Sequence, residues 1–218
     1  MRFVGITGGI GSGKSIVMDY LREHTNSEVV LADDLAKELM APGTDLNKRL
    51  QKEFGSLSKE EMNSNSTMEG MEPLFEADGN IRPWAFAKWV LADEEKRKRL
   101  NALVHPAVKK EILRRVAHHR EKKDVDYFFL EAALLIEDGY KELCDELWYI
   151  FVTEENRRER LKQNRGYDDS RIDEAFRMQL QEYEFLDACC VTIDNNGTKE
   201  ETYEQLERVL SLRKPRSV

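Results

Sequence analysis

A glycine-rich segment near the start of the chain has the residue types and the spacing of a phosphate-binding loop. Its sequence is Gly8-Gly9-Ile10-Gly11-Ser12-Gly13-Lys14-Ser15, which fits the pattern G-x-x-x-x-G-K-[ST]. Glycines let successive backbone N–H groups turn toward a phosphate, and a following helix adds unpaired N–H groups at the positive end of its dipole. We therefore predict that residues Gly9 to Ile16 hold the phosphates of a nucleotide.

Two side chains at the end of this loop have separate chemical roles. Lys14 can reach the β- and γ-phosphates, and Ser15 can offer its hydroxyl to a Mg²⁺ ion that bridges two phosphates. The alternative is a glycine-rich turn that binds nothing. The flanking segments argue against that alternative, because residues 2–7 form an apolar strand-like run and residues 15–21 begin a helix with apolar spacing.

Strand-like and helical segments alternate along the chain, which predicts an α/β fold with a parallel sheet and helices on both of its faces. Apolar runs typical of buried strands lie at residues 2–7, 28–33, 126–131, 146–152 and 189–194. Further helical patterns lie at residues 34–40 and 45–54, and the capping box Thr198-Lys199-Glu200-Glu201 begins a last helix that runs toward Leu212.

Two regions interrupt this alternation. Residues 83–122 have a helical pattern punctuated at His105-Pro106, and we expect them to form a helical insertion beside the active edge of the sheet. The polar segment 56–72 is expected to be a surface loop or a short extra helix. The chain as a whole is long enough for one α/β domain with a substantial core.

The composition limits the classes of partner. Charged residues make up 35% of the 218 residues and the formal net charge is -8, so we expect no general affinity for nucleic acid or acidic membranes. The sequence has no segment of membrane-spanning length and no signal-peptide pattern. We expect a cytoplasmic protein that acts on small molecules and is a monomer with at most weak self-association.

Two carboxylates are placed where predicted strands end. Asp33 ends the second strand-like run and Glu131 ends the third, and the carboxyl ends of parallel strands open on one crevice. Asp33 can accept a proton from an acceptor hydroxyl, and Glu131 can hold a water bound to Mg²⁺. The alternative for Asp33 is a helix N-cap, which Asp34 can also provide. We favour catalysis for Asp33, whereas for Glu131 a site role and no role both stay open.

A helix expected after residue 153 carries a second group of candidates: Arg157, Arg158, Arg160, Lys162 and Arg165. Arginine makes forked contacts to phosphate oxygens, and a mobile helical flap that carries it can neutralise the transferring group and exclude water. We predict this lid role for Arg160 and Arg165. For Arg157 and Arg158 we predict a solvated helix face with ion pairs such as Glu154 with Arg158.

Other residues are expected to serve the structure. His118 and His119 project in different directions from a helix, so we expect both on the surface and neither at a metal. Trp84 and Trp89 are expected in the core rather than on a base-stacking platform. The three cysteines form no C-x-x-C pair, two of them fall in the last strand-like run, and we expect reduced core thiols.

The order and types of several short motifs resemble those of dephospho-CoA kinases. The resemblance spans about residues 2–210 and rests on the following residues: the loop from Ile6 to Ser15, Ala32-Asp33, Pro42-Gly43, Asp78-Gly79 followed by Arg82, Leu100-Asn101 with His105-Pro106, Leu134-Leu135-Ile136-Glu137, Gln179, and Asp194-Asn195-Asn196-Gly197. The loop alone is suggestive, whereas the Asn-Asn-Gly near the end together with the Leu-Asn and His-Pro pairs makes the resemblance specific.

The resemblance implies a Mg²⁺-dependent kinase that transfers the γ-phosphate of ATP to the ribose 3′-hydroxyl of dephospho-CoA, the last step of coenzyme A synthesis. It implies a three-layer α/β/α P-loop NTPase fold within residues 1–212. The implied parts are a nucleotide core (about 1–55, 124–152 and 187–212), a helical CoA-binding insertion (about 73–123) and a lid (about 153–186). By position it implies Asp33 as the catalytic base, Asn195 and Gly197 near the adenine, and Arg82 and His105 with Lys37 on the acceptor side.

The chain departs from the family pattern at several positions. Leu31 stands where the family often has Asp, Lys37 stands where Arg is usual, and Ala133 replaces a proline. Asn164 holds the usual second arginine position of the lid, and Arg165 follows one place later. Lys37 supplies a point charge but no forked contact. The alternatives are a P-loop kinase for a nucleoside or another metabolite, and a nucleotide switch that binds without phosphorylating; the sequence lacks the N-K-x-D motif of a GTPase.

Overall fold

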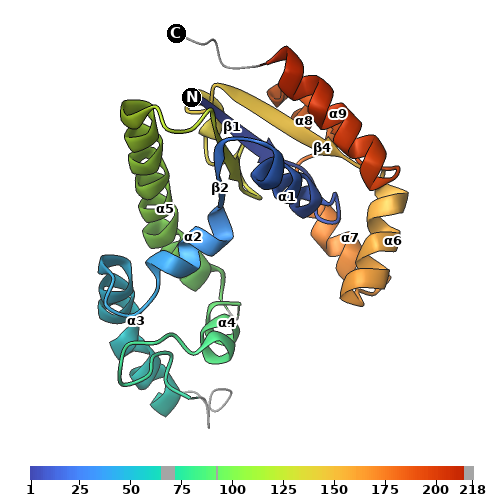
Figure 1. Ribbon diagram of the computed structural model, residues 1–218. Helices are drawn as coiled ribbons and strands as arrows, with labels where there is room; N and C mark the ends of the chain where they lie inside the picture. Colours follow the sequence, from blue (N-terminus) through green and yellow to red (C-terminus); the bar gives the residue numbers. More distant parts are fainter. Residues whose placement is uncertain (65–71, 92, 214–218) are drawn as a thin grey trace. The chain divides into compact units, whose positions relative to one another are not determined.

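The computed structural model describes residues 1–64, 72–91 and 93–213, and these residues form two compact units (Figure 1). The first unit comprises residues 1–31 and 116–213, and the second comprises residues 32–115 within the described ranges. The first unit contains the sheet and the phosphate loop, and the second is mainly helical. No helix in the described ranges is both long and apolar enough to cross a membrane.

A parallel sheet forms the centre of the first unit. Its strands are β1 (Arg2–Thr7), β2 (Ser27–Leu31), β3 (Tyr127–Glu131), β4 (Glu146–Phe151) and β5 (Val191–Asp194). In the described part of the chain they pair in the order β2-β3-β1-β4-β5, and every pair is parallel. The strand order reverses at β1, and folds of this kind bind ligands beyond the carboxyl end of the sheet at such a point. The predicted α/β fold with a parallel sheet is confirmed.

Helices cover both faces of this sheet, as buried parallel strands require. The helices of the first unit are α1 (Lys14–His24), the C-terminal end of α5 (Glu94–Lys122), η1 (Tyr140–Glu142), α6 (Glu154–Arg165), α7 (Asp169–Arg177), α8 (Glu182–Ala188) and α9 (Lys199–Leu212). On one face, Val4 packs with Leu21 of α1 and Leu206 of α9. On the other face, Tyr149 of β4 stacks on Phe185 of α8 with ring centres 4.8 Å apart.

The second unit has its own hydrophobic core. It consists of α2 (Ala32–Leu39), α3 (Asp45–Ser64), α4 (Pro83–Leu91) and the larger part of α5. Phe54 of α3 packs edge to face on Trp89 of α4, with ring centres 5.2 Å apart. The buried Asn47 donates from Nδ2 to the carbonyls of Met40 and Gly79, at 2.9 and 3.0 Å. This amide therefore ties two loops of the unit to α3.

Several elements differ in extent from the sequence prediction. Strand β2 ends at Leu31, so Asp33 lies in the first turn of α2 and not at a strand end. Helix α3 continues to Ser64 through the first part of the polar segment, and residues 65–71 of that segment lie outside the described residues. Helix α5 runs through Pro106 without interruption. The helical bond lost at the proline is offset by packing, since Val104 and Ala107 lie against the core of the second unit.

Two expectations about buried side chains, those for Trp84 and Cys190, are wrong. Trp84 is 80% exposed, whereas Trp89 is 1% exposed as predicted; five residues of a helix turn through about 140° from one direction to another. Cys189 and Cys190 precede β5, and Cys190 is exposed, because α8 extends to Ala188 and the strand begins only at Val191.

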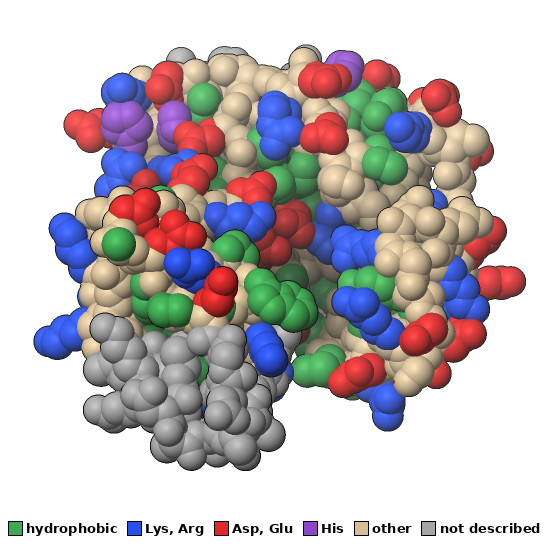
Figure 2. All heavy atoms as spheres, turned by 90° about the horizontal axis from the view of Figure 1, so that it is seen from below, with side chains coloured by type: hydrophobic (Ala, Val, Ile, Leu, Met, Phe, Trp, Pro, Cys, Tyr) green, Lys and Arg blue, Asp and Glu red, His purple; other side chains and the backbone are tan. Residues whose placement is uncertain are grey.

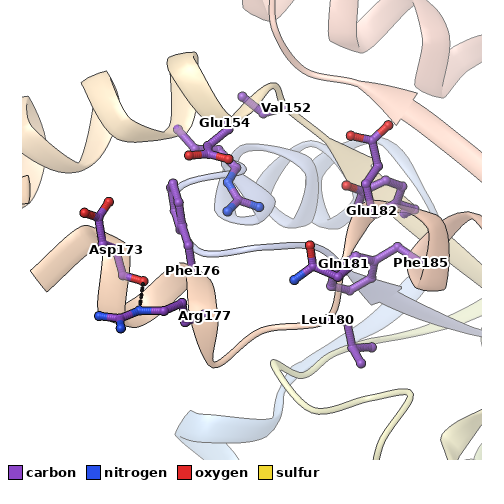
Figure 3. A pocket seen from close by; sticks show the side chains of 11 residues that line it. Val152, Glu154, Asp173, Phe176, Arg177, Leu180, Gln181, Glu182 and Phe185 are labelled. Carbon is purple, nitrogen blue, oxygen red and sulfur yellow. Dashed lines mark hydrogen bonds between the residues drawn. The ribbon is translucent and has the colours of Figure 1, made fainter. Parts of the chain in front are cut away.

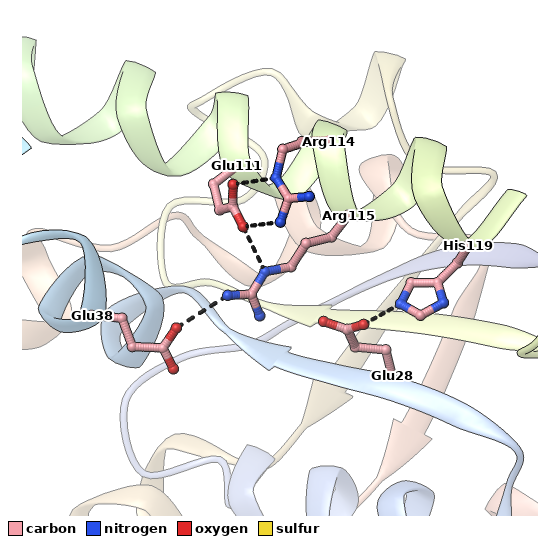
Figure 4. Close-up of polar contacts among 6 residues, drawn as sticks. All are labelled: Glu28, Glu38, Glu111, Arg114, Arg115 and His119. Atoms are coloured by element: carbon pink, nitrogen blue, oxygen red, sulfur yellow. Dashed lines mark hydrogen bonds and ion pairs between the residues drawn. The ribbon is translucent and has the colours of Figure 1, made fainter. Parts of the chain in front are cut away.

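His119 is not a surface residue. Only 14% of its side chain is exposed, its Nδ1 lies 2.7 Å from Oδ1 of Asp124, and its Nε2 contacts the carboxylate of Glu28 (Figure 4). The hydrogen bond with Asp124, and then the one with Glu28, raises the pKa of His119 above its ordinary value. His118 is exposed, as expected.

Acidic and basic side chains are interspersed on the face of the molecule in Figure 2, without a broad region of one sign. Many of them form short-range pairs. In the second unit, Glu111 accepts hydrogen bonds from Arg114 at 2.7 Å and from Arg115 at 3.0 Å, and Arg115 also contacts Glu38 of α2 at 3.1 Å (Figure 4).

These contacts predict a pH dependence of stability. The hydrogen bond from Arg114, helped by Arg115, lowers the pKa of Glu111 from 4.5 to about 2. Because the folded pKa lies below the unfolded one, this carboxylate stabilises the fold above about pH 4.5, and the contribution is lost as the pH falls through about 2. In urea titrations at a series of pH values, we expect the free energy of unfolding to fall less between about pH 5 and 2 in Glu111→Gln than in the wild type. Equal falls would contradict this role.

Candidate active site

The phosphate loop connects β1 to α1, and glycine determines its shape. Gly11 and Gly13 have φ angles of 80° and 79°, in the left-handed region that other residues rarely adopt. Gly13 is the N-cap of α1, no side chain of the described residues caps this helix, and its first turn, which contains Ser15 and Ile16, has no acidic residue. The N–H of Ile16 donates to the carbonyl of Gly13 at 3.0 Å, and the helix start with its positive dipole end is suited to an anion, as in phosphate-binding sites.

Lys14 and Glu131 lie together beside this loop. Lys14 Nζ donates to the carbonyl of Gly8 at 2.8 Å and lies 3.6 Å from Oε1 of Glu131. Both side chains are mostly buried, with 15% and 17% exposed. Glu131 is the last residue of β3 and is in register with Ile6 of β1. The parallel pairing thus brings this carboxylate to the lysine beside the loop.

Asn195 holds the second half of the loop from outside. Its side chain is buried, and Nδ2 donates to the carbonyl of Ser12 at 2.7 Å while Oδ1 accepts from the hydroxyl of Thr202 at 2.8 Å. A Cβ at Gly13 would overlap this Nδ2, so only glycine allows the approach. The nitrogen and the oxygen of this amide are therefore both used to fix the loop. Gly197 lies two residues after Asn195, directly before Thr198, the N-cap of α9.

Helix α6 carries Arg160 to the same place. The hydroxyl of Thr153 accepts from the N–H of Asn156 at the start of this helix, and Gly166 ends it in the left-handed conformation. Arg160 Nη2 donates to the carbonyl of Asn195 at 2.7 Å. Its Nη1 is buried without a hydrogen-bond partner in the described residues and lies 3.6 Å from the position of a Cβ on Gly13. An unpartnered donor beside a phosphate loop is suited to a phosphate oxygen.

The prediction of a solvated face for Arg157 is wrong, whereas that for Arg158 is confirmed. Arg158 pairs with Glu154, Asp169 and Asp173. Arg157 instead reaches the loop, where a Cβ on Gly9 would overlap its Nη1. The two arginines are neighbours and project about 100° apart from the helix, so only one of them can face the carboxylates of α7.

Gln179 contacts the loop from the segment after α7. Its Oε1 accepts a hydrogen bond from the N–H of Ile10 at 3.0 Å. The segment from α6 to Gln179 therefore meets both halves of the loop, at Ile10 through Gln179 and at Gly13 through Arg160. Arg165 is exposed at the last residue of α6. Arg157 is the residue that the sequence analysis missed; the available signal was its position three residues before Arg160, on the same side of the helix.

The predicted acceptor-side residues all lie in the second unit. Asp33 is exposed, and Lys37 pairs with Asp34 at 2.7 Å on the exposed surface of α2. Arg82 Nη1 contacts Glu72 at 3.1 Å, while its Nε is buried without a partner in the described residues. His105 is partly buried on α5.

A cavity of about 680 Å³ lies between the end of β4 and helices α6, α7 and α8 (Figure 3). It is lined by Tyr149, Val152, Glu154, Arg157, Asp173, Phe176, Arg177, Leu180, Gln181, Glu182 and Phe185. The wall combines aromatic rings with Arg157, the residue that touches the phosphate loop. Open space therefore lies between helices α6, α7 and α8, on the side of α6 that carries Arg157.

Comparisons with known proteins agree with this geometry. The family model for dephospho-CoA kinase matches residues 2–201. The dephospho-CoA kinase of Geobacter sulfurreducens is 34% identical over 215 residues, which cover 99% of this chain and 100% of that protein. The dephospho-CoA kinase of Shouchella clausii is 31% identical, with 95% of this chain and 96% of that protein covered.

Solved structures agree in fold. TT1252 from Thermus thermophilus superposes with a TM-score of 0.71 at 25% identity, covering 98% of both chains. A dephospho-CoA kinase from Campylobacter jejuni superposes with a TM-score of 0.64 at 19% identity, covering 96% of this chain and 95% of that chain. The likeness to the Campylobacter jejuni structure shows that the two chains share a fold.

Proposed function

Because this chain belongs to the dephospho-CoA kinase family, we propose that it transfers the γ-phosphoryl group of ATP to the ribose 3′-hydroxyl of dephospho-CoA. The products are coenzyme A and ADP, and the reaction is the last step of coenzyme A synthesis. The observation that carries the proposal is the open N-terminus of α1 with the guanidinium of Arg160 held beside it.

The loop binds the triphosphate. The loop residues from Gly11 to Ile16 surround the phosphates, where the N–H groups of Ser12 and Ile16 bond to loop carbonyls and keep the turn in shape. Lys14 leaves the carbonyl of Gly8 to contact the β- and γ-phosphates. Arg160 adds a second cation through its unpartnered Nη1. Asn195 keeps the loop in place through its amide, which is bonded to Ser12 and Thr202, and Asn195 and Gly197 lie near the adenine.

Ser15 and Glu131 have the donor atoms that Mg²⁺ prefers. The ion takes hydroxyl, carboxylate and water oxygens. The carboxylate of Glu131 lies 3.6 Å from Nζ of Lys14, the group that contacts the same phosphates. We propose that Ser15 and Glu131 hold the ion, directly or through water. A bound Mg²⁺ would neutralise charge on the β- and γ-phosphates.

The acceptor side is proposed in the second unit. Asp33 orients the ribose 3′-hydroxyl and takes its proton as the acceptor oxygen bonds to the γ-phosphorus and the bond from that phosphorus to the leaving ADP oxygen breaks. Lys37, Arg82 and His105 bind the acceptor, and the buried, unpartnered Nε of Arg82 supports an anionic group there.

The three free cysteines agree with a reducing compartment such as the cytoplasm.

The proposal is tested by an ADP-release assay with ATP, Mg²⁺ and a panel of acceptors. We expect dephospho-CoA to give the highest kcat/KM, with adenosine and simple sugars near background. Phosphorus NMR of the product should place the new phosphate on the ribose 3′-oxygen. A higher kcat/KM with a nucleoside or sugar would reassign the enzyme to another metabolite, and ATP binding without turnover of any acceptor would favour a nucleotide switch.

A further inference from the structure

Helix α6 places one guanidinium at each end of the glycine segment of the loop. Arg157 and Arg160 are three positions apart, so they project from the same side of the helix. A Cβ on Gly9 would overlap Nη1 of Arg157 and lie 2.7 Å from its Cζ, whereas Arg160 lies beside Gly13. Because Gly9 has no side chain, the guanidinium of Arg157 can lie directly against the backbone of the loop.

Two carboxylates, Glu154 and Glu182, line the same cavity as Arg157 and favour its charge without forming an ion pair with it. Across the described ranges no carboxylate forms an ion pair with it, and its Nε is buried without a hydrogen-bond partner. The guanidinium lies 4.2 Å from the centre of the Phe176 ring, and burial lowers the pKa of Arg157. A buried cation without a hydrogen-bonded anion is destabilising for the fold. Its place beside the phosphate loop is explained if an anion arrives from outside the chain.

The terminal phosphoryl group of a bound nucleotide fits this place. The N-terminus of α1 and the N–H groups near Gly13 receive the inner phosphates, as phosphate loops do. Gly9 lies near the other end of the loop, next to β1, where Gln179 also reaches the N–H of Ile10. A phosphate chain that starts at α1 and extends along the loop brings its outer end toward Arg157.

We propose that Arg157 is a catalytic residue whose guanidinium contacts the γ-phosphoryl group of ATP while Arg160 contacts the inner phosphates. The inference rests on the proposed function for the transfer itself. It gives Arg157 the role that the sequence analysis assigned to Arg165, which is exposed at the end of α6.

Nucleotide binding alone provides the first test, because it does not depend on the identity of the acceptor. The Kd values of ADP and of a non-hydrolysable ATP analogue are measured by calorimetry for the wild type, Arg157→Met and the matched control Arg158→Met, the next residue of the same helix, which pairs with carboxylates at the surface. We expect Arg157→Met to reduce the preference for the ATP analogue over ADP by about tenfold or more, the worth of one charged hydrogen bond. The Kd of ADP should change by less than about threefold, and Arg158→Met should keep the wild-type preference.

Kinetics provide the second test. With dephospho-CoA as acceptor, we expect Arg157→Met to lower kcat by about tenfold to a hundredfold and Arg157→Lys to fall between it and the wild type, because lysine keeps the charge and loses the fork. Weakening of ADP and the ATP analogue by the same factor would overturn the proposal and leave Arg157 as a packing residue of the loop. If Arg157→Met does not fold, a folded Arg157→Lys with wild-type kcat and wild-type nucleotide preference would overturn it. A reduced preference in nucleotide binding with no turnover of dephospho-CoA by the wild type would instead reject the acceptor.

Discussion

Replacing Lys14 by alanine is expected to lower kcat by about 10²–10³-fold, the usual effect of removing one donor that stabilises developing charge. Lys14 is the first residue of α1, and its Nζ contacts the carbonyl of Gly8 and lies 3.6 Å from the carboxylate of Glu131. The ammonium group can exchange the carbonyl for phosphate oxygens, so the loss should fall on the transfer step. The measurement is ADP release with ATP and dephospho-CoA.

The control for this prediction is Lys48→Ala. Lys48 is an exposed lysine of α3 that pairs with Asp45 at 3.8 Å, and its loss should change kcat by less than about twofold because exposed pairs contribute little. Circular dichroism should give similar spectra for both variants. A folded Lys14→Ala protein with wild-type turnover would remove the basis for the phosphate-loop assignment.

The parallel strands and the phosphate loop could be predicted from the sequence because each has a strong local signal. Strand β1 agrees in both of its ends, and β3 and β4 agree to within one residue, since each is a continuous apolar run. Glu131 followed from the same logic: the end of a strand is readable, and parallel pairing places it beside the loop. For these strands, the residues of the segment itself are enough to predict where the strand begins and ends.

The errors come from residues whose place depends on tertiary contacts. Arg157 and Arg158 are alike in sequence, and the choice between them is made by the carboxylates of α7 and by the absence of a Cβ on Gly9. His119 was expected at the surface because neighbouring helix residues project in different directions, but Glu28 and Asp124, which lie outside the helix, enclose it. Composition and periodicity do not contain these pairings, which require the fold to be known.

The most consequential local error was the predicted end of β2, which was placed two residues too late. Five residues from Ser27 to Leu31 form the strand, and the helix begins at once at Ala32. The sequence analysis extended the strand to Asp33 because the apolar run is followed directly by two aspartates. Element boundaries are where local patterns compete, and here the helical preference of Ala32 and of acidic residues in a first turn prevailed. Asp33 is therefore an exposed side chain in the first turn of α2.

The second prediction concerns this residue. Asp33 is two residues beyond β2, in the first turn of α2, and it is exposed. If its carboxylate takes the proton of the ribose 3′-hydroxyl, asparagine keeps its size and much of its hydrogen-bonding shape but removes the base. We expect Asp33→Asn to lower kcat with dephospho-CoA by at least about 10²-fold, the lower range for a positioned general base. The Kd of ATP should change by less than about threefold.

Asp34→Asn is the matched control, because Asp34 is the next carboxylate of the same helix turn and pairs with Lys37 at the surface. We expect its kcat to stay within about threefold of the wild type, which separates a specific base from a general loss of negative charge near the start of α2. A folded Asp33→Asn enzyme with wild-type kcat would assign the proton to another group. Equal losses in Asp33→Asn and Asp34→Asn would assign both carboxylates to the helix start rather than to the chemistry.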